Sequence, residues 1–134
     1  MDLIATDFLY GDITDQIIKS FYRVYNSLGY GFLEKVYENA MKIELEKIGY
    51  YIETQKPLEV FYEKKLVGAY IADIIVERKV IIENKAANAL LDTNEDQLLN
   101  YLKATEIEVG LLLNFGKKPE FKRKIFENKY KQIR

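Results

Sequence analysis

The segment Val109–Phe115 constrains the fold of this chain more than any other, because only Asn114 within it is polar. Successive side chains of a strand point to opposite faces of the sheet, so this strand would be apolar on both faces. Such strands are typical of sheets that helices cover on both sides. The segment therefore predicts a buried strand in a layered α/β fold.

The segments before it predict the elements that could form those layers. Apolar residues at helical spacing predict helices over 12–28 and about 33–48, which end at Gly29 and Gly49. Beyond Pro57 the pattern becomes that of strands and turns. The expected strands are 58–62, 66–76, 79–85, 109–115 and 121–126, with reversals at 63–65 and near Arg78.

One more helix is expected between the third and fourth strands. Residues 92–96 resemble a helix cap, and Leu98 and Leu102 belong to the apolar stripe behind it. A crossover through this helix lets three antiparallel strands be followed by a fourth that is parallel to the third. The 134 residues contain no repeat or long linker. We therefore expect one domain, residues 1–134, with a mixed sheet flanked by helices.

The composition excludes several kinds of chemistry, because the chain has no cysteine and no histidine. Disulfides, thiolate zinc sites, haem and iron–sulfur ligation, and catalysis by an imidazole base are all ruled out. The two serines, Ser20 and Ser27, lie in a predicted helix without a partner that could activate them. Carboxylates, lysines, tyrosines and a hard metal ion remain available.

Charge and hydropathy indicate the environment of the protein. No segment has the roughly 18 consecutive apolar residues that cross a bilayer. Residues 1–7 are acidic and lack the features of a signal peptide, so we expect a cytoplasmic protein without membrane association. Residues 117–134 carry eight basic and two acidic residues, although the net charge of the chain is −1. Such a segment either contacts a polyanion or forms a solvated strand edge or helix face.

Three charged residues stand in or at the end of strands that are otherwise apolar, namely Asp73, Glu83 and Lys85. Charged side chains are rarely buried unless they are paired. Alternation places Glu83 and Lys85 on one face of the sheet and Asn84 on the other. If the chain reverses at Arg78, Asp73 lies opposite Glu83, and the two carboxylates need a compensating cation.

Two cations could compensate these carboxylates. In one interpretation Lys85 does so within a structural ion cluster. In the other, Asp73 and Glu83 hold Mg²⁺ or Mn²⁺, which prefer oxygen ligands, and Lys85 lies beside the attacking water. The spacing alone leaves both interpretations open.

The same residues resemble a known family. Asp73 followed by Glu83-Asn84-Lys85 across a hairpin resembles the PD-(D/E)XK nuclease superfamily. The segment 31–37, Gly-Phe-Leu-Glu-Lys-Val-Tyr, is similar to the signature of the GxxExxY proteins, a branch of that superfamily. The likeness continues in the family's order through residues 67–73, 83–86, 97–102 and 110–116, and extends from about Ile13 to Phe126.

The resemblance implies a three-layer, restriction-endonuclease-like core and the hydrolysis of phosphodiesters. It implies that Asp73, Glu83 and the main-chain carbonyl of Asn84 hold Mg²⁺ or Mn²⁺. Lys85 would orient or deprotonate the attacking water and stabilise charge on the phosphate. Glu34 would supplement this site from its helix.

The resemblance also assigns Gln97 and Tyr101 as a polar pair on the helix after the hairpin. They stand four residues apart and so share one helical face. Tyr101 is expected to contact the substrate. The basic residues interleaved in the last strand are expected to bind its phosphates. These residues are Lys122, Arg123 and Lys124.

The sequence departs from the family pattern at two positions. Asn84 stands where relatives usually carry an apolar residue such as leucine, and Asn94 stands where many carry histidine. Neither change removes an expected ligand. The Asn84 side chain would point away from the metal, so its consequence concerns packing more than chemistry.

Three functions are consistent with these observations. The first is a Mg²⁺-dependent nuclease that acts on DNA or RNA. The second is a nucleic-acid-binding or regulatory module that retains the nuclease fold without turnover, which the small net charge favours. The third is a metal-held structural domain that acts through a homodimer or a protein partner. Tyr50 and Tyr51, expected to be exposed, are its only indication.

Overall fold

The computed structural model describes residues 9–131. Its elements, in chain order, are α1 (Gly11–Leu28), α2 (Glu34–Ile48), β1 (Ile52–Tyr62), β2 (Lys65–Val76), β3 (Val80–Lys85), α3 (Asp92–Lys103), β4 (Val109–Phe115), β5 (Pro119–Ile125) and the 3-10 helix η2 (Asn128–Tyr130). The acidic residues 1–7 and the basic Arg134 considered above lie outside the described residues. The predicted order of elements is confirmed, although β1 begins before Pro57.

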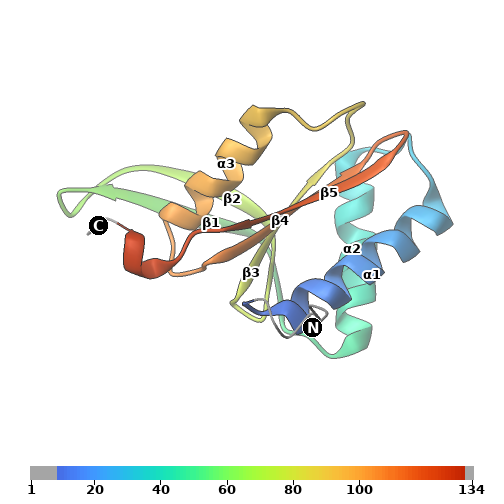
Figure 1. Cartoon of the computed structure of the whole chain (residues 1–134), viewed down its shortest axis with the longest axis horizontal. Coiled ribbons are helices and arrows are strands. Elements are labelled where there is room, and N and C mark those ends of the chain that lie inside the picture. Colours follow the sequence, from blue (N-terminus) through green and yellow to red (C-terminus); the bar gives the residue numbers. More distant parts are fainter. Residues whose placement is uncertain (1–8, 132–134) are drawn as a thin grey trace, which may run out of the picture.

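The five strands form one mixed sheet in the order β1-β2-β3-β4-β5. β3 and β4 are parallel, and the other neighbouring pairs are antiparallel. Helices α1 and α2 cover one face of the sheet, and α3 covers the other (Figure 1). The predicted crossover through α3 is therefore confirmed. Within residues 9–131, none of the helices has both the length and the apolar character needed to cross a membrane.

Each face of the sheet has its own apolar core. Phe21 of α1 and Met41 of α2 pack with Leu111 and other residues of the sheet on one side. Leu98 of α3 packs with Leu112 and others on the other side. The whole of β4 is buried, because its alternate side chains enter the two cores, and each buried leucine contributes about 1.5–3 kcal/mol.

Two local expectations need correction. The helix cap predicted over residues 92–96 lies one residue later than the observed start: α3 begins at Asp92 after Leu91, and the Asn94 side chain contributes to the cap by accepting a hydrogen bond from the Leu91 N–H at 2.9 Å. Tyr50, expected to be exposed, is partly buried against the core beside α1 and α2. Tyr51 is exposed, with the Arg78 guanidinium 5.1 Å from its ring centre.

The β1–β2 hairpin extends beyond the body of the sheet (Figure 1). β1 pairs with β2 from Ile52–Val76 to Tyr62–Lys65, whereas β3 pairs with only the last three residues of β2. The outer part of the hairpin is therefore largely exposed on both faces. One of these faces is turned toward α3, because Tyr70 contacts Tyr101.

Asn84 is a buried polar residue in the core beside α1 and α2. It is buried opposite Leu113 of β4, and both polar atoms of its side chain lack a hydrogen-bond partner within the described structure. Such groups lower the free energy of unfolding, because they have lost their hydrogen bonds to water and have gained none within the protein. Leucine has the same number and branching of non-hydrogen side-chain atoms as asparagine and no polar group, so Asn84→Leu is expected to stabilise the protein by about 1–3 kcal/mol.

Urea unfolding measures this effect, and Asn39→Leu on the exposed surface of α2 is the matched control. We expect the denaturation midpoint of Asn84→Leu to rise and that of the control to change little. A lower midpoint for Asn84→Leu would show that the buried amide makes a stabilising interaction.

Candidate active site

The candidate site lies where β2 and β3 separate. Their ladder ends at the pair Ile74–Ile82, and the next residues, Asp73 and Glu83, bond through their side chains instead. Glu83 Oε1 accepts a hydrogen bond from the Asp73 N–H at 3.1 Å, and Asp73 Oδ2 accepts one from the Asn84 N–H at 2.8 Å. Each carboxylate satisfies a main-chain donor that the separating strands leave without a strand partner. The two carboxylates are thereby held together.

The environment of these carboxylates opposes their charge. Burial, with the nearby charge of Asp73, raises the pKa of Glu83 to about 8. Burial also raises the pKa of Asp73, and the hydrogen bond from Asn84 partly opposes that shift. Both groups are therefore hard to ionise together unless a cation joins them.

Lys85 supplies positive charge at this point of the sheet. It stands two residues after Glu83 in β3, on the same face, and its charge lowers the pKa of both carboxyl groups. The salt bridges of residues 9–131 do not include Lys85. Its effect on the carboxylates is thus one of proximity rather than of direct ion pairing.

Helix α2 adds two glutamates to this region. Glu34 is the first residue of α2, and its negative charge raises the pKa of both Asp73 and Glu83. Glu38 lies one turn later, is only 4% exposed, and also raises the pKa of Asp73. Four carboxyl groups therefore lie in or near the site, two from the sheet and two from α2.

Glu38 is held in place by two neighbours. Lys35 Nζ lies 2.5 Å from its Oε2, and Gln55 Nε2 donates a hydrogen bond to its Oε1 at 2.6 Å. Gln55 has a positive φ of 52° within β1, between the residues that pair with Ile74 and Ala72. This backbone conformation is energetically costly for a residue other than glycine. It occurs at the residue whose side-chain hydrogen bond to Glu38 links β1 to α2 beside the site.

Helix α3 presents its polar pair toward the carboxylates. Gln97 Nε2 donates a hydrogen bond to the Tyr101 hydroxyl at 2.9 Å, so the two residues share one helical face as predicted. Burial raises the pKa of Tyr101 to about 12, and the charges of Glu83 and Asp73 contribute. The phenol therefore stays protonated and lies within electrostatic reach of both carboxylates.

The basic residues of β5 do not form one group. Lys122 is exposed, and Lys124 is ion-paired with Glu95 of α3. Arg123 points to the opposite face of the strand and donates a hydrogen bond to the Leu9 carbonyl at 2.5 Å. The structure thus places Lys122 and Lys124 on the α3 side of the sheet and Arg123 on the α1 side.

Comparison with known proteins agrees with this architecture. A family model described as the PD-(D/E)XK nuclease superfamily matches residues 11–124. The chain belongs to the PD-(D/E)XK nuclease superfamily. The mixed sheet between helical layers is consistent with the restriction-endonuclease-like fold of that superfamily.

Among solved structures, the crystal structure of SSO0001 is similar, with a TM-score of 0.56 and 19% sequence identity. The match covers 69% of this chain and 50% of SSO0001, so the chain spans about half the length of that protein. At this identity the likeness supports the fold alone. A search of curated proteins gave no match.

PD-(D/E)XK nucleases generally use divalent metal ions, and the donors at the strand split suit one. Asp73 and Glu83 offer hard oxygen donors, and a cation between them would offset the burial that raises both pKa values and the charge of Asp73 that acts on Glu83. Within residues 9–131, no three acidic, histidine or cysteine side chains form a metal-binding group. Mg²⁺ needs only one or two carboxylates, because water and substrate phosphates complete its coordination.

The sequence analysis missed three residues near the candidate site. Glu38 could have been found, because it lies four residues after Glu34 and hence on the same helical face. Tyr70, whose ring centre is 5.3 Å from that of Tyr101, looked like one more strand residue. Gln55 had no signal, because its positive φ depends on the surrounding fold.

The metal-free protein is expected to lose stability as the pH rises. Because the pKa of Glu83 is about 8 in the folded state and 4.5 ordinarily, the folded state keeps a proton that the unfolded state loses between these values. The contribution of Glu83 to stability is therefore full below about pH 4.5, falls across this window and is lost above pH 8, a change of up to a few kcal/mol. The raised pKa of Asp73 acts in the same direction.

Glu83→Gln tests this origin, because the amide cannot ionise. Urea unfolding in chelator at several pH values should give a smaller slope of stability against pH for Glu83→Gln than for the unmodified protein. Glu59→Gln, an exposed position in β1, should keep the full slope. An unchanged slope in Glu83→Gln would assign the pH dependence to other groups, among them the nearby Asp73.

Proposed function

We propose that this protein is a Mg²⁺- or Mn²⁺-dependent nuclease that hydrolyses phosphodiester bonds of DNA or RNA. The observation that carries the proposal is the carboxylate pair at the strand split, the buried Glu83 and the partly buried Asp73, with Lys85 on the same face of the sheet as Glu83. We also assign the chain to the GxxExxY branch, on the residues of segment 31–37, and infer that it acts as one cytoplasmic domain.

The roles follow from the positions of the side chains. Asp73, Glu83 and the main-chain carbonyl of Asn84 would hold the ion. When bound, a divalent ion supplies the charge that activates water and stabilises the phosphate in the transition state. Lys85 would stabilise negative charge on the phosphate as an ammonium, and it would orient the attacking water or, as a neutral amine, accept its proton.

The helical residues would complete the site around these groups. Glu34 brings a further oxygen ligand or water acceptor from the start of α2. Gln97 orients the Tyr101 hydroxyl through their hydrogen bond, and Tyr101 remains a neutral donor to the substrate because of its raised pKa. Lys122 is the residue of β5 most available to a phosphate, because it is exposed while Lys124 is paired with Glu95.

A cleavage assay tests the proposal. Labelled single- and double-stranded DNA and RNA are incubated with the protein in Mg²⁺, Mn²⁺, Ca²⁺ or chelator. We expect cleavage of at least one substrate in Mg²⁺ or Mn²⁺, its loss in chelator and its return when the metal is restored.

Calorimetric titration of the same metals completes the test. Metal binding without cleavage of any substrate would contradict the nuclease proposal and favour the second function, a nucleic-acid-binding or regulatory module. If neither cleavage nor metal binding were found, Lys85 would be the cation that compensates the two carboxylates, and the proposal would be wrong.

A further inference from the structure

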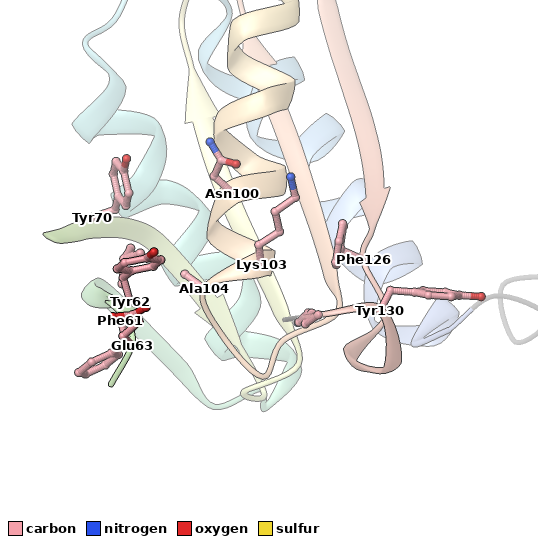
Figure 2. A pocket seen from close by; sticks show the side chains of 11 residues that line it. Phe61, Tyr62, Glu63, Tyr70, Asn100, Lys103, Ala104, Phe126 and Tyr130 are labelled. Carbon is pink, nitrogen blue, oxygen red and sulfur yellow. The ribbon is translucent and has the colours of Figure 1, made fainter. Parts of the chain in front are cut away.

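A groove opens between the β1–β2 hairpin, α3 and the chain after β5 (Figure 2). It has a volume of about 760 Å³. Figure 2 shows residues of the hairpin on one side, of α3 in the middle, and of the chain after β5 on the other side. The residues that matter for its chemistry are Phe61, Tyr62, Tyr70, Lys103, Phe126 and Tyr130.

Aromatic rings are unusually exposed in this groove. Tyr62 and Tyr130 are 68% and 66% exposed, and Phe61 and Tyr70 also present large parts of their rings to solvent. Exposed rings that line one groove mark a binding site more often than chance exposure. Flat rings at the surface can stack on other planar groups, as nucleobases do on aromatic side chains.

The charge of the groove suits an anionic ligand. Two lysines line it, Lys103 and Lys131, against a single carboxylate, Glu63. Lys103 Nζ lies 5.5 Å from the centre of the Phe126 ring, so an ammonium and an aromatic face stand together. Lys131 Nζ donates hydrogen bonds to two main-chain carbonyls and is thereby fixed at the end of the groove. Rings combined with ammonium groups match the bases and phosphates of a nucleic acid.

A ring contact links the groove to the candidate active site. Tyr70 lines the groove, and the centre of its ring is 5.3 Å from that of Tyr101. Tyr101 in turn lies within electrostatic reach of Glu83 and Asp73, whose charges raise its pKa. The groove therefore adjoins a residue of the candidate active site.

We propose that this groove binds a single-stranded segment of nucleic acid, whose unpaired bases stack on Tyr62 and Tyr70 while Lys103 contacts a phosphate. The proposal rests on the proposed nuclease function and adds its substrate class. A duplex is disfavoured, because its bases are stacked on one another and do not present free faces to the rings.

Binding in chelator tests the groove without any need for cleavage. Fluorescence anisotropy is measured with a labelled oligothymidylate of about 15 nucleotides, the matching oligouridylate and a duplex of the same length. We expect tighter binding of at least one single strand than of the duplex. Tyr62→Ala should weaken that binding about 5- to 30-fold, the loss of one stacked base. Tyr51→Ala, an exposed tyrosine at the opposite end of β1, is the matched control and should bind normally.

Lys103→Ala gives a second, independent readout. The logarithm of its affinity should fall less steeply with the logarithm of salt concentration than that of the unmodified protein, because one phosphate contact is lost. Lys19→Ala on the exposed surface of α1 should keep the original slope. An unchanged slope in Lys103→Ala would remove this lysine from the phosphate contacts.

The outcomes separate this inference from the proposed function. Equal binding by Tyr62→Ala and the unmodified protein, or tighter binding of the duplex, would show that the groove does not bind a single strand, even if the protein is a nuclease. Tyr62-dependent binding in a protein that cleaves no substrate would support single-strand binding in the groove and contradict the nuclease function. If sedimentation showed a dimer that Tyr62→Ala dissociates without a change in oligonucleotide binding, the groove would be an interface between two copies, and the inference would be wrong.

Discussion

Lys85→Ala is expected to lower metal-dependent cleavage about 100- to 1,000-fold while the protein remains folded. Lys85 follows Glu83 on the same face of β3 and places an ammonium beside the carboxylates, where negative charge develops on the phosphate during attack. Removing one such stabilising group in a preorganised site has an effect of this size. The rate is measured on the substrate that the unmodified protein cleaves, under single-turnover conditions.

Two controls separate catalysis from structure in this variant. Lys19→Ala, an exposed lysine of α1, should cleave at the normal rate. Calorimetry should show that Lys85→Ala still binds Mn²⁺, because the carboxylates remain. A variant that cleaves normally would exclude Lys85 from the chemistry. A variant that is unfolded at low denaturant would favour the structural ion cluster.

The largest loss of stability is expected for Tyr37→Ala, at about 3–5 kcal/mol. Tyr37 is fully buried in α2, and its ring stacks on Phe115 of β4 with centres 4.3 Å apart. Its hydroxyl donates a hydrogen bond to the Gly29 carbonyl at 2.7 Å and accepts one from the Phe32 N–H at 3.2 Å. The residue therefore joins α2, the sheet and the loop that leads into Glu34. Urea or thermal unfolding measures the change.

Tyr37→Phe divides this effect into packing and hydrogen bonding. It keeps the ring and removes the hydroxyl, so we expect a smaller loss of about 1–3 kcal/mol. Tyr22→Ala, a more exposed aromatic residue on α1, should cost less than Tyr37→Ala. If Tyr37→Ala were no more harmful than Tyr22→Ala, the loop before Glu34 would not depend on this side chain.

Much of the fold could be predicted because burial leaves a periodic pattern. Val109–Phe115 is buried on both faces because it lies between two helical layers, and its run of apolar residues indicated this position. The opposition of Asp73 and Glu83 followed from alternation and from a reversal near Arg78. The structure has that reversal, because Val76 pairs with Val80.

The parts that were missed depend on three-dimensional context. The positive φ of Gln55 and its bond to Glu38 arise where β1 meets α2, which no local pattern specifies. The length of β1 was underestimated because residues before Pro57 have no clear alternation. The aromatic groove combines three segments that are far apart in the sequence, so Tyr62 and Tyr130 gave no signal of belonging together.

The central claim is that the carboxylate pair at the strand split makes this protein a metal-dependent nuclease. The most direct measurement compares the unmodified protein, Asp73→Asn and the exposed control Asp12→Asn for cleavage in the same Mg²⁺ or Mn²⁺ buffer. The account predicts cleavage by the unmodified protein and the control, and a loss of at least about 1,000-fold in Asp73→Asn, since a metal ligand is removed. Cleavage by Asp73→Asn at the rate of the control would contradict it.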